Sequence, residues 1–454
     1  MKINKHIFRG YDIRGKYPTD LNSDVANIIG RSFGTYVKRL GKDTCIVGRD
    51  NRYSSLELST SLIEGILSTG INVIDIGLVT TPMYYYACIL KNNPTGIMIT
   101  ASHNPKDDNG FKFAFDERGN ARGEMIEDFR AFTLKGEFDT GVGRLTKFDV
   151  RDDYIKLMLS SINFGKKELK VVLDLGNGTT SFIAKDIFYR FPVDVEVIYG
   201  ESDPNFPNHH PDPSIEENLK SLKRKVLELD ADIGIAFDGD GDRLGVIDEK
   251  GNYVSTDKLM IVIIRDIINK VNNKKFLYDV KCSKSLEDEI IKLGGIPVCY
   301  RTGNSYVKAK IKEDNIPFGG ELSGHVYFND TWPGFDSGIY AGLRLIEILS
   351  KNDKSLSELL DGINYYEETP EIKIISKDEV KFDVVNKIKD YCIEKGYNII
   401  SIDGVKVNFS FGWALIRCSN TGPHITMKFE ADNKEKLKEM QDEFMVLVDK
   451  YNNV

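Results

Sequence analysis

Three aspartates that alternate with glycines form the most chemically suggestive segment of this sequence. The segment DGDGDR contains Asp238, Asp240 and Asp242 and lies between two apolar runs that are typical of strands. Carboxylates at this spacing, with glycines between them, can turn so that three oxygens converge on one hard cation. Arg243 follows directly and offers a planar donor fork to a phosphate. The segment therefore predicts a metal site beside a phosphate.

Two other interpretations of this segment compete with the metal site. In an EF-hand loop, Glu249 would be the ligand at the twelfth position from Asp238. That loop needs glycine at its sixth position, where this chain has Arg243, and it needs helices rather than strands on both sides. The second interpretation is a solvated acidic hairpin. The strict alternation of carboxylates directly after an apolar strand favours the metal site over both.

A second polar segment, TASHNP, ends a predicted strand at residues 96–100 and contains Ser102 and His103. Side chains at the carboxyl end of a strand lie where open α/β sheets bind their ligands. A serine hydroxyl is a poor nucleophile unless a base, a metal or prior phosphorylation activates it. The hexapeptide lacks the GxSxG elbow of serine hydrolases. Taken alone, it fits an active serine and a polar turn equally well.

These two segments together resemble the active-serine loop and the metal loop of the α-D-phosphohexomutase superfamily, the phosphoglucomutases and phosphomannomutases. Five further motifs extend the resemblance over essentially the whole chain. They are FRGYDIRG at 8–15, NGFK at 109–112, DVK at 279–281, GELSGH at 320–325 and RCSNT at 417–421. Each motif is weak alone, but their shared order and spacing make chance agreement negligible.

The resemblance implies a phosphorylated serine next to a magnesium ion. In the family, the metal bridges the serine phosphate and three aspartates, which gives Ser102, Asp238, Asp240 and Asp242 as the metal site of this chain. Magnesium suits oxygen ligands and phosphate better than a softer metal does. His103 is not needed as a ligand in this scheme, so a structural and a supporting role both stay open.

The resemblance also implies which charged residues act on the transferring phosphoryl group. Arg14, Lys112 and Arg243 would offset the charge that spreads over its equatorial oxygens. Lys112 is the family's candidate proton shuttle for the sugar hydroxyl, with His325 as a second. A lysine in that role needs a pKa that burial or neighbouring cations have lowered.

The sugar is expected at the GELSGH loop, because the family uses the positions of Glu321 and Ser323 for the hydroxyls O3 and O4. The motif differs by one apolar residue from the GEMSGH of phosphomannomutase/phosphoglucomutase enzymes, a nearly volume-conserving change. It is not the GEQSGH common among phosphoglucosamine mutases. That difference weakens an amino-sugar substrate but does not exclude it.

The phosphate that is not transferred is expected at the RCSNT loop. A guanidinium, hydroxyls, an amide and backbone N–H groups can form an anion cradle there. The residues implied are Arg417, Ser419, Asn420 and Thr421. Supporting contacts are expected from Tyr11, Lys281 and Arg301. The chain departs from the family at Gly422, which precedes a proline, and at Asn304, where close relatives often carry histidine.

Strand and helix signals predict four domains that position these loops. They alternate in the first three parts of the chain, which is typical of α/β structure, whereas a helix, four closely spaced strands and a final helix end the chain. We expect three α/β mixed-sheet domains and a C-terminal α+β domain around a central cleft. The expected domains are 1–146 with the serine loop, 147–251 with the metal loop, 252–366 with the sugar loop and 367–454 with the phosphate loop.

Composition limits the class of protein. At 454 residues the chain is too long for one core, and it is 41% hydrophobic and 29% charged. The net charge of −8 argues against nucleic acid as a partner. We find no apolar run of membrane-spanning length and no secretion signal. Six scattered cysteines without metal-binding spacing favour a reducing compartment, with the cytoplasm as the default.

The expected activity is that of a phosphohexomutase acting on mannose and/or glucose phosphates. Phosphoserine 102 would donate to a hexose 1- or 6-phosphate, and the hexose 1,6-bisphosphate formed would serve as intermediate and activator. The partners expected are small sugar phosphates, for a monomer or weak homodimer. A phosphoglucosamine mutase is the alternative, and a serine phosphatase or a non-catalytic sugar-phosphate binder is less favoured.

Overall fold

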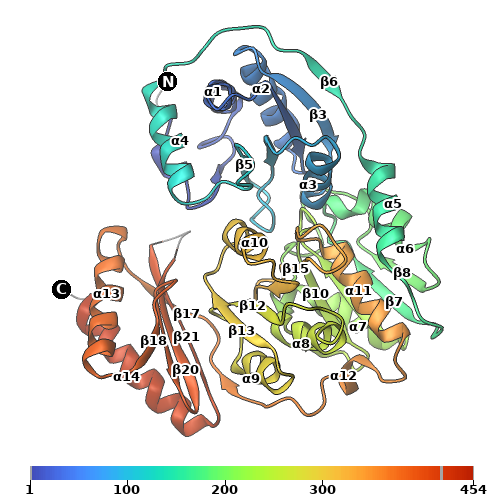
Figure 1. Ribbon diagram of the computed structural model, residues 1–454, viewed down its shortest axis with the longest axis vertical. Helices are drawn as coiled ribbons and strands as arrows, with labels where there is room; N and C mark the ends of the chain where they lie inside the picture. Colours follow the sequence, from blue (N-terminus) through green and yellow to red (C-terminus); the bar gives the residue numbers. More distant parts are fainter. Residues whose placement is uncertain (1–2, 420–422, 453–454) are drawn as a thin grey trace. The chain divides into compact units, whose positions relative to one another are not determined.

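The computed structural model describes residues 3–419 and 423–452. The chain forms two compact units, and it passes from the first to the second and back before ending in the second. The first unit comprises Met1–Ser255 and Ser323–Leu359, and the second comprises Thr256–Leu322 and Leu360–Val454. Helices flank the sheets of each unit, as Figure 1 shows.

The first sheet of the first unit has six strands in the order β1-β5-β4-β2-β3-β6. β5 is antiparallel to β1 and β4, and the other neighbours are parallel. Its core is rich in aromatic rings, among them Phe33, Phe113 and Phe129. The strands are β1 (Ile13–Lys16), β2 (Thr44–Arg49), β3 (Asn72–Leu78), β4 (Gly96–Ile99), β5 (Asp108–Ala114) and β6 (Leu145–Lys147). The helices are η1 (Lys5–Ile7), α1 (Ser23–Arg39), α2 (Ser55–Leu67), α3 (Thr81–Leu90) and α4 (Glu124–Lys135).

The second sheet of this unit has the order β11-β10-β9-β7-β8. β9 is buried at every residue, which explains why the sequence shows a continuous apolar run before the aspartates. The strands are β7 (Lys170–Asp174), β8 (Asp194–Ile198), β9 (Ile233–Phe237), β10 (Leu244–Asp248) and β11 (Tyr253–Val254). The helices are α5 (Arg151–Ser161), η2 (Thr179–Phe182), α6 (Ala184–Phe188), η3 (Glu216–Leu219), α7 (Lys220–Glu228), α11 (Gly338–Ser350) and α12 (Leu356–Leu359). The strand β15 (Val326–Phe328) also belongs to the first unit.

The second unit contains a parallel sheet and an antiparallel sheet. In the parallel sheet, β12 (Lys275–Asp279) pairs with β13 (Ile296–Tyr300) and with β14 (Phe318–Gly320). The helices of this part are α8 (Thr256–Ile267), α9 (Lys284–Lys292) and α10 (Asn304–Glu313). Parallel neighbours need crossover connections, and α9 and α10 follow β12 and β13 in that role.

The antiparallel sheet has the order β16-β21-β20-β19-β18, with β17 also paired to β21. Helices α13 (Asp378–Glu394) and α14 (Lys434–Asn452) lie together on one side of this sheet in Figure 1. Their apolar faces join the strands in one core that includes Ile388, Ile416, Phe429 and Phe444. The strands are β16 (Glu367–Glu368), β17 (Ile372–Ile375), β18 (Asn398–Ile400), β19 (Val405–Phe409), β20 (Gly412–Cys418) and β21 (His424–Ala431).

The expected fold class, α/β domains followed by a C-terminal α+β domain, is confirmed. One element differs from the sequence pattern, which predicts a single helix over residues 180–189. The structure has η2 and α6 there, separated at Ile183, whose φ of −138° is not helical. The start of η2 is tied to the aspartate loop, because the N–H of Thr179 donates to the Gly239 carbonyl. Within the described residues, no helix is both long and apolar enough to cross a membrane.

Candidate active site

The serine loop follows β4 and holds Ser102 in a conformation that few side chains adopt. The φ angle of Ser102 is +51°, in the left-handed region. Its N–H donates to the Thr100 hydroxyl at 2.8 Å, and its residue is 2% exposed. Surrounding contacts must hold such a strained residue in place.

Arg52 supplies those contacts. Its buried guanidinium donates to four backbone carbonyls of the loop, those of Ser102 (2.8 Å), Asn104 (2.6 Å), Pro105 (2.6 Å) and Asp108 (3.0 Å). Sequence reasoning missed Arg52. Its position after β2, in the polar loop RDNR, was the only signal in the sequence.

The aspartate loop connects β9 to β10 and lies directly against the serine loop. A Cβ atom at Gly239 would come within 2.5 Å of the Ser102 carbonyl oxygen, so only glycine permits this approach. The Ser102 hydroxyl donates to Asp238 Oδ2 at 2.7 Å. The structure thus brings the predicted nucleophile and the predicted metal ligands together in one unit.

The three carboxylates are arranged so that some oxygens are satisfied and others are not. Oxygen atoms of Asp238, Asp240 and Asp242 lie within 4.8 Å of one another, and all three residues are buried. Asp240 Oδ2 accepts from Thr81 (2.7 Å), Thr100 (3.0 Å) and Lys112 (3.1 Å). The Oδ1 atoms of Asp240 and Asp242 accept no hydrogen bond from any described residue.

This arrangement fits a magnesium ion. Buried carboxylate oxygens without a hydrogen-bond partner are costly unless a cation neutralises them. All three donors are hard oxygens from one loop, which is the ligand chemistry that magnesium takes from proteins. The Ser102 hydroxyl lies beside the same cluster, at 2.7 Å from Asp238.

Burial and nearby charges shift the pKa values of Asp238 and Asp240 in opposite directions. Burial, and then the neighbouring Asp240 and Asp242, raise the pKa of Asp238 well above its usual range. Burial alone would also raise the pKa of Asp240, but Lys112 and the Thr81 hydroxyl outweigh it and lower that pKa. A mixed pattern of this kind is typical of a functional carboxylate cluster.

Lys112 donates to both Asp240 (3.1 Å) and Asp242 (2.8 Å). Burial alone would lower its pKa, but these two carboxylates raise the pKa of Lys112 well above that of a free lysine. A lysine that shuttles a proton needs a lowered pKa, so the expected direction of the shift is wrong. The direction differs because the aspartates, not cations, are its nearest charges.

Arg14 lies near the same loop with one donor unused. Its Nε donates to Asp12 at 2.7 Å, whereas its buried Nη1 donates to no described residue. Burial alone would lower the pKa of Arg14, but Asp12 outweighs it, so the guanidinium stays charged. Tyr11, a predicted supporting contact, is half-buried. An orphan guanidinium nitrogen at this point suits an anionic ligand.

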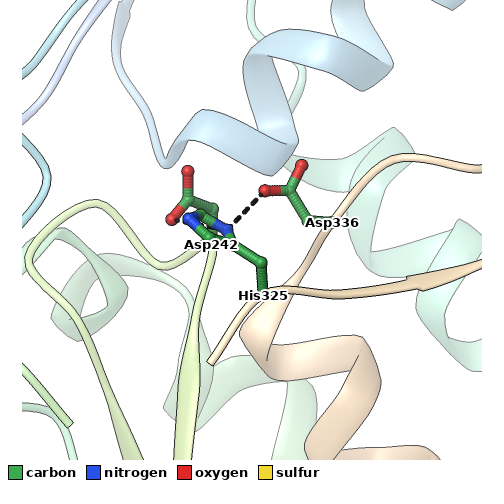
Figure 2. A group of neighbouring side chains, drawn as sticks. All are labelled: Asp242, His325 and Asp336. Atoms are coloured by element: carbon green, nitrogen blue, oxygen red, sulfur yellow. Dashed lines mark hydrogen bonds and ion pairs between the residues drawn. The ribbon is translucent and has the colours of Figure 1, made fainter. Parts of the chain in front are cut away.

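His325 lies between Arg243 and two carboxylates. Its Nε2 accepts from Arg243 Nε at 3.0 Å, and its Nδ1 is 2.8 Å from Asp336 and 3.5 Å from Asp242. Figure 2 shows His325 between the carboxylates of Asp242 and Asp336. Asp336 is fully buried and comes just before the cap of α11. No sequence motif marked Asp336.

His103 lies beside the nucleophile rather than among the metal ligands. Its Nδ1 is 3.4 Å from the Ser102 hydroxyl. Burial, and then Arg243 and Arg14, lower the pKa of His103 well below the usual histidine value. The imidazole is therefore neutral near physiological pH.

The second unit holds the predicted sugar residue Glu321 and the predicted contacts Lys281 and Arg301. Glu321 is 1% exposed, and its carboxylate accepts from the Gly303 N–H at 2.6 Å. The guanidinium of Arg301 stacks over Tyr306 at 4.0 Å, and its buried Nε donates to no described residue. Lys281 forms an ion pair with Glu371 at 3.5 Å. Ser323 stands in the turn that begins the returning segment of the first unit.

The predicted phosphate cradle also lies in the second unit. Arg417 forms an ion pair with Asp403 at 3.1 Å, and Asp403 accepts from the Thr302 N–H at 3.3 Å. Ser419 is buried, and its carbonyl accepts from Lys381 at 2.8 Å. Asn420 and Thr421, together with Gly422, lie outside the described residues.

The chain is similar to known proteins over nearly its full length. It matches the phosphoglucomutase/phosphomannomutase alpha/beta/alpha domains I, II and III over residues 5–139, 152–251 and 255–366, and the C-terminal domain over residues 371–446. It is 40% identical to a phosphomannomutase/phosphoglucomutase of Pseudomonas putida, over 96% of this chain and 94% of that protein. It is 37% identical to a phosphoglucomutase of Neisseria gonorrhoeae, over 98% of this chain and 97% of that protein.

A crystal structure shows the same similarity in three dimensions. A phosphoglucomutase/phosphomannomutase family protein from Burkholderia thailandensis superposes with a TM-score of 0.91 at 36% identity, covering 98% of this chain and 97% of that chain. In sequence, the four family matches span all the predicted site residues.

Proposed function

Because this chain belongs to the phosphoglucomutase/phosphomannomutase family, we propose that it interconverts hexose 1-phosphates and hexose 6-phosphates. The observation that carries the proposal is the contact between the Ser102 hydroxyl and the aspartate loop at 2.7 Å. The serine is held against a cluster of buried carboxylates whose chemistry suits a cation. It suits a phosphate carrier better than a hydrolytic nucleophile.

In the proposed cycle, Ser102 carries a phosphate that passes to the free hydroxyl of the bound hexose phosphate. The resulting hexose 1,6-bisphosphate turns in the site and returns its other phosphate to Ser102, so phosphate is neither gained nor lost. Bisphosphate that escapes leaves an unphosphorylated enzyme, and added bisphosphate restores the phosphoserine. That exchange makes the bisphosphate an activator.

Asp238, Asp240 and Asp242, with the phosphate on Ser102, would hold a magnesium ion. When bound, the ion neutralises charge on the transferring phosphoryl group and fixes its orientation. The proposal is supported by the two Oδ1 atoms that accept no hydrogen bond from a described residue. Three donors hold Asp240 by its other oxygen, so its Oδ1 keeps a defined direction.

Three cations of the first unit would stabilise the charge of the transferring group. Lys112 already bridges two of the aspartates, Arg14 has an unused donor, and Arg243 follows the last aspartate. In phosphoryl transfer, positioned cations account for most of the protein's contribution. We assign Lys112 first as a cation, and its proposed exchange of a proton with the sugar hydroxyl is secondary.

The substrate groups that do not react are assigned to the other loops. Glu321 and Ser323 would bind the hydroxyls O3 and O4, and a buried carboxylate such as Glu321 accepts two hydroxyl hydrogen bonds well. Arg417, Ser419, Asn420 and Thr421 would bind the distal phosphate, with Lys281, Arg301 and Tyr11 in support. Since glucose and mannose share O3 and O4, both should be substrates.

One assay tests the proposed function against its alternatives. Glucose, mannose and glucosamine 1-phosphates are supplied separately with magnesium and a trace of bisphosphate, and both isomers and inorganic phosphate are measured. A mutase forms the 6-phosphates of glucose and mannose, within roughly tenfold of each other in kcat/KM. Net release of inorganic phosphate would identify a phosphatase, and no turnover would identify a binder. A preference above ~10⁴-fold for one sugar would overturn the assignment of Glu321 and Ser323.

The finer organisation is also part of the proposal. We propose four domains, over residues 1–146, 147–251, 252–366 and 367–454, each contributing one loop to the reaction. We also propose a monomer or weak homodimer in the cytoplasm, a compartment that suits six cysteines without a disulfide. Limited proteolysis at the three boundaries and sedimentation of the intact protein test these points.

A further inference from the structure

We propose that Asp336 and His325 form a relay that positions the guanidinium of Arg243. In this relay, His325 serves as a hydrogen-bond acceptor held in one tautomer, not as the second proton shuttle. The proposal rests on the proposed function in one respect only, which is that Arg243 faces a phosphate. The hydrogen-bond directions within the relay follow from the contacts of the first unit alone.

The three residues come from separate segments that meet below the protein surface. Arg243 ends the aspartate loop, His325 precedes β15, and Asp336 precedes α11. His325 is 4% exposed and Asp336 is fully buried. The His325 ring also stacks near Tyr327, with 6.3 Å between ring centroids. Little freedom therefore remains for the imidazole to turn over.

The direction of each hydrogen bond follows from the chemistry of arginine. A guanidinium nitrogen can donate but cannot accept, so the contact of Arg243 Nε with His325 Nε2 at 3.0 Å requires an unprotonated Nε2. The ring proton of a neutral imidazole must then reside on Nδ1. That nitrogen is 2.8 Å from Asp336 Oδ2, which accepts it. Asp336 thus selects the tautomer that can receive Arg243.

The relay leaves the outer edge of Arg243 for a ligand. Within residues 3–419 and 423–452, the Arg243 side chain donates a hydrogen bond only through Nε, to His325. Nε lies 3.9 Å from Asp238 and 4.0 Å from Asp242, beyond hydrogen-bonding distance. With Nε engaged, the two Nη groups remain as a fork of the kind that binds phosphate in two places.

The same contacts argue against His325 as a proton carrier for the sugar. A proton carrier must reach the reacting hydroxyl directly or through one water. In this structure Arg243 takes one ring nitrogen, and the carboxylates of Asp336 and Asp242 face the other. A cation bound by Asp242, His325 and Asp336 would need an unprotonated Nδ1. The ring proton would then be on Nε2, where it would face the Nε–H donor of Arg243.

The tautomer is measured by nitrogen NMR on the intact protein labelled with ¹⁵N in its imidazole rings. The chain has six histidines, and the His325 signals are those lost in His325→Gln. We expect a protonated Nδ1 and an unprotonated Nε2 for His325. A proton on Nε2, or an exchange-averaged pair of signals, would overturn the relay. Because this readout needs no turnover, the relay and the proposed mutase activity can fail separately.

Kinetics test the role of the relay. The glutamine of His325→Gln supplies an acceptor for Arg243 but cannot shuttle protons near neutral pH, so we expect kcat within about tenfold of the native protein. His325→Ala removes the acceptor and should lower kcat by more than ~10²-fold. Equal losses of kcat in both variants, in the ~10²–10⁴-fold range of a lost acid–base group, would contradict the proposal.

A double-mutant cycle then shows whether Asp336 acts through Arg243. Asp336→Asn should lower kcat/KM by ~10-fold or more in the native background and by less than ~3-fold in the Arg243→Lys background, because coupled residues are not additive. The matched control is Asp330→Asn, which removes the same charge from an ion pair with Arg344 at 3.2 Å. Its effect should be the same in both backgrounds. An undiminished effect of Asp336→Asn beside Arg243→Lys would overturn the proposal.

Discussion

The Ser102 hydroxyl donates to the Asp238 carboxylate across 2.7 Å, although the two residues are 136 positions apart in the chain. Their contact requires glycine at position 239, and it requires Arg52 to hold the carbonyls of the serine loop. The proposed nucleophile, the proposed metal ligands and the groups that position both are thereby brought together within the first unit.

The nucleophile is tested by Ser102→Ala. Removal of a covalent nucleophile should lower kcat for glucose 1-phosphate by at least ~10³-fold. Intact mass of the native protein should show a fraction heavier by one phosphate, which peptide mapping assigns to Ser102. The control Ser160→Ala changes an exposed serine whose hydroxyl bonds only within α5, and it should keep both activity and the heavier fraction. Full activity of Ser102→Ala would eliminate the phosphoserine route.

The metal site is tested by chelation and by Asp240→Asn. Chelator-treated protein should lose activity and regain it with magnesium. Magnesium should also raise the Tm of the native protein, since a ligand that binds the folded state stabilises it. Asp240→Asn should reduce both effects, because an amide oxygen carries no charge. Asp116→Asn, at a surface pair with Arg118, is the control and should leave the Tm shift unchanged. A magnesium response that survives intact in Asp240→Asn would place the ion elsewhere.

The orientation of Asp240 is tested by Thr81→Val, which keeps the shape of the side chain and removes one of three donors to Oδ2. A hydrogen bond to a charged group contributes about 1.5–3 kcal/mol, so magnesium affinity should fall by roughly 10- to 100-fold. The measurement is the magnesium concentration for half-maximal activity. Thr60→Val, an exposed threonine of α2, should leave that concentration unchanged. An equal response of the two variants would mean that Thr81 does not orient the ligand.

The close approach of the two loops is tested by Gly239→Ala. The new methyl group would meet the Ser102 carbonyl at 2.5 Å, so the loops must separate and activity should fall by ~10²-fold or more, as misplacement by about an ångström can do. Gly77→Ala is the comparison: a Cβ there meets nothing within 4 Å, and only its φ of +68° costs about 1–2 kcal/mol. Gly77→Ala should therefore lower the stability of the protein but leave turnover nearly unchanged. A larger loss of activity in Gly77→Ala than in Gly239→Ala would argue against the contact between the two loops.

The stability of the second unit should depend on pH through Glu430. Burial raises the pKa of this carboxyl to about 7, although the Ser283 hydroxyl and the Lys284 N–H partly offset that effect. The Trp413 indole also donates to it at 2.9 Å. Because the folded protein binds the proton more tightly than the unfolded chain, stability is greatest below pH 4.5 for this group and falls as pH rises toward 7.

The measurement for Glu430 is urea unfolding between pH 5 and pH 8, in the native protein and in Glu430→Gln. The amide mimics the protonated acid, so its pH profile should be flatter by up to about 3 kcal/mol across this range. Trp413 fluorescence reports on the same region. Glu367→Gln changes an acidic residue at the neighbouring edge strand and should keep the native slope. Parallel profiles for native protein and Glu430→Gln would show that Glu430 is not protonated in the folded state.

The sequence by itself determined the chemistry and the family. The motifs DGDGDR, TASHNP and GELSGH are local, so residue types and spacing predicted a metal loop, and the resemblance to the family added the predictions of a serine loop and a sugar loop. The same local patterns predicted the helix, the antiparallel strands and the final helix of the last domain. At Ile183 the local pattern predicted one helix and the chain forms two.

Only the tertiary structure decided which residues support those loops. Thr81 and Asp336 belong to no sequence motif. The fold brings Thr81 into contact with Asp240, 159 positions away in the chain, and Asp336 into contact with His325. It also decided the direction of the Lys112 pKa shift, which depends on the carboxylates that surround the ammonium. Hydrogen-bond partners and charges in space are set by how distant segments pack. The order of residues along the chain shows which chemical groups are present. It does not show which distant residues will lie beside those groups and orient them.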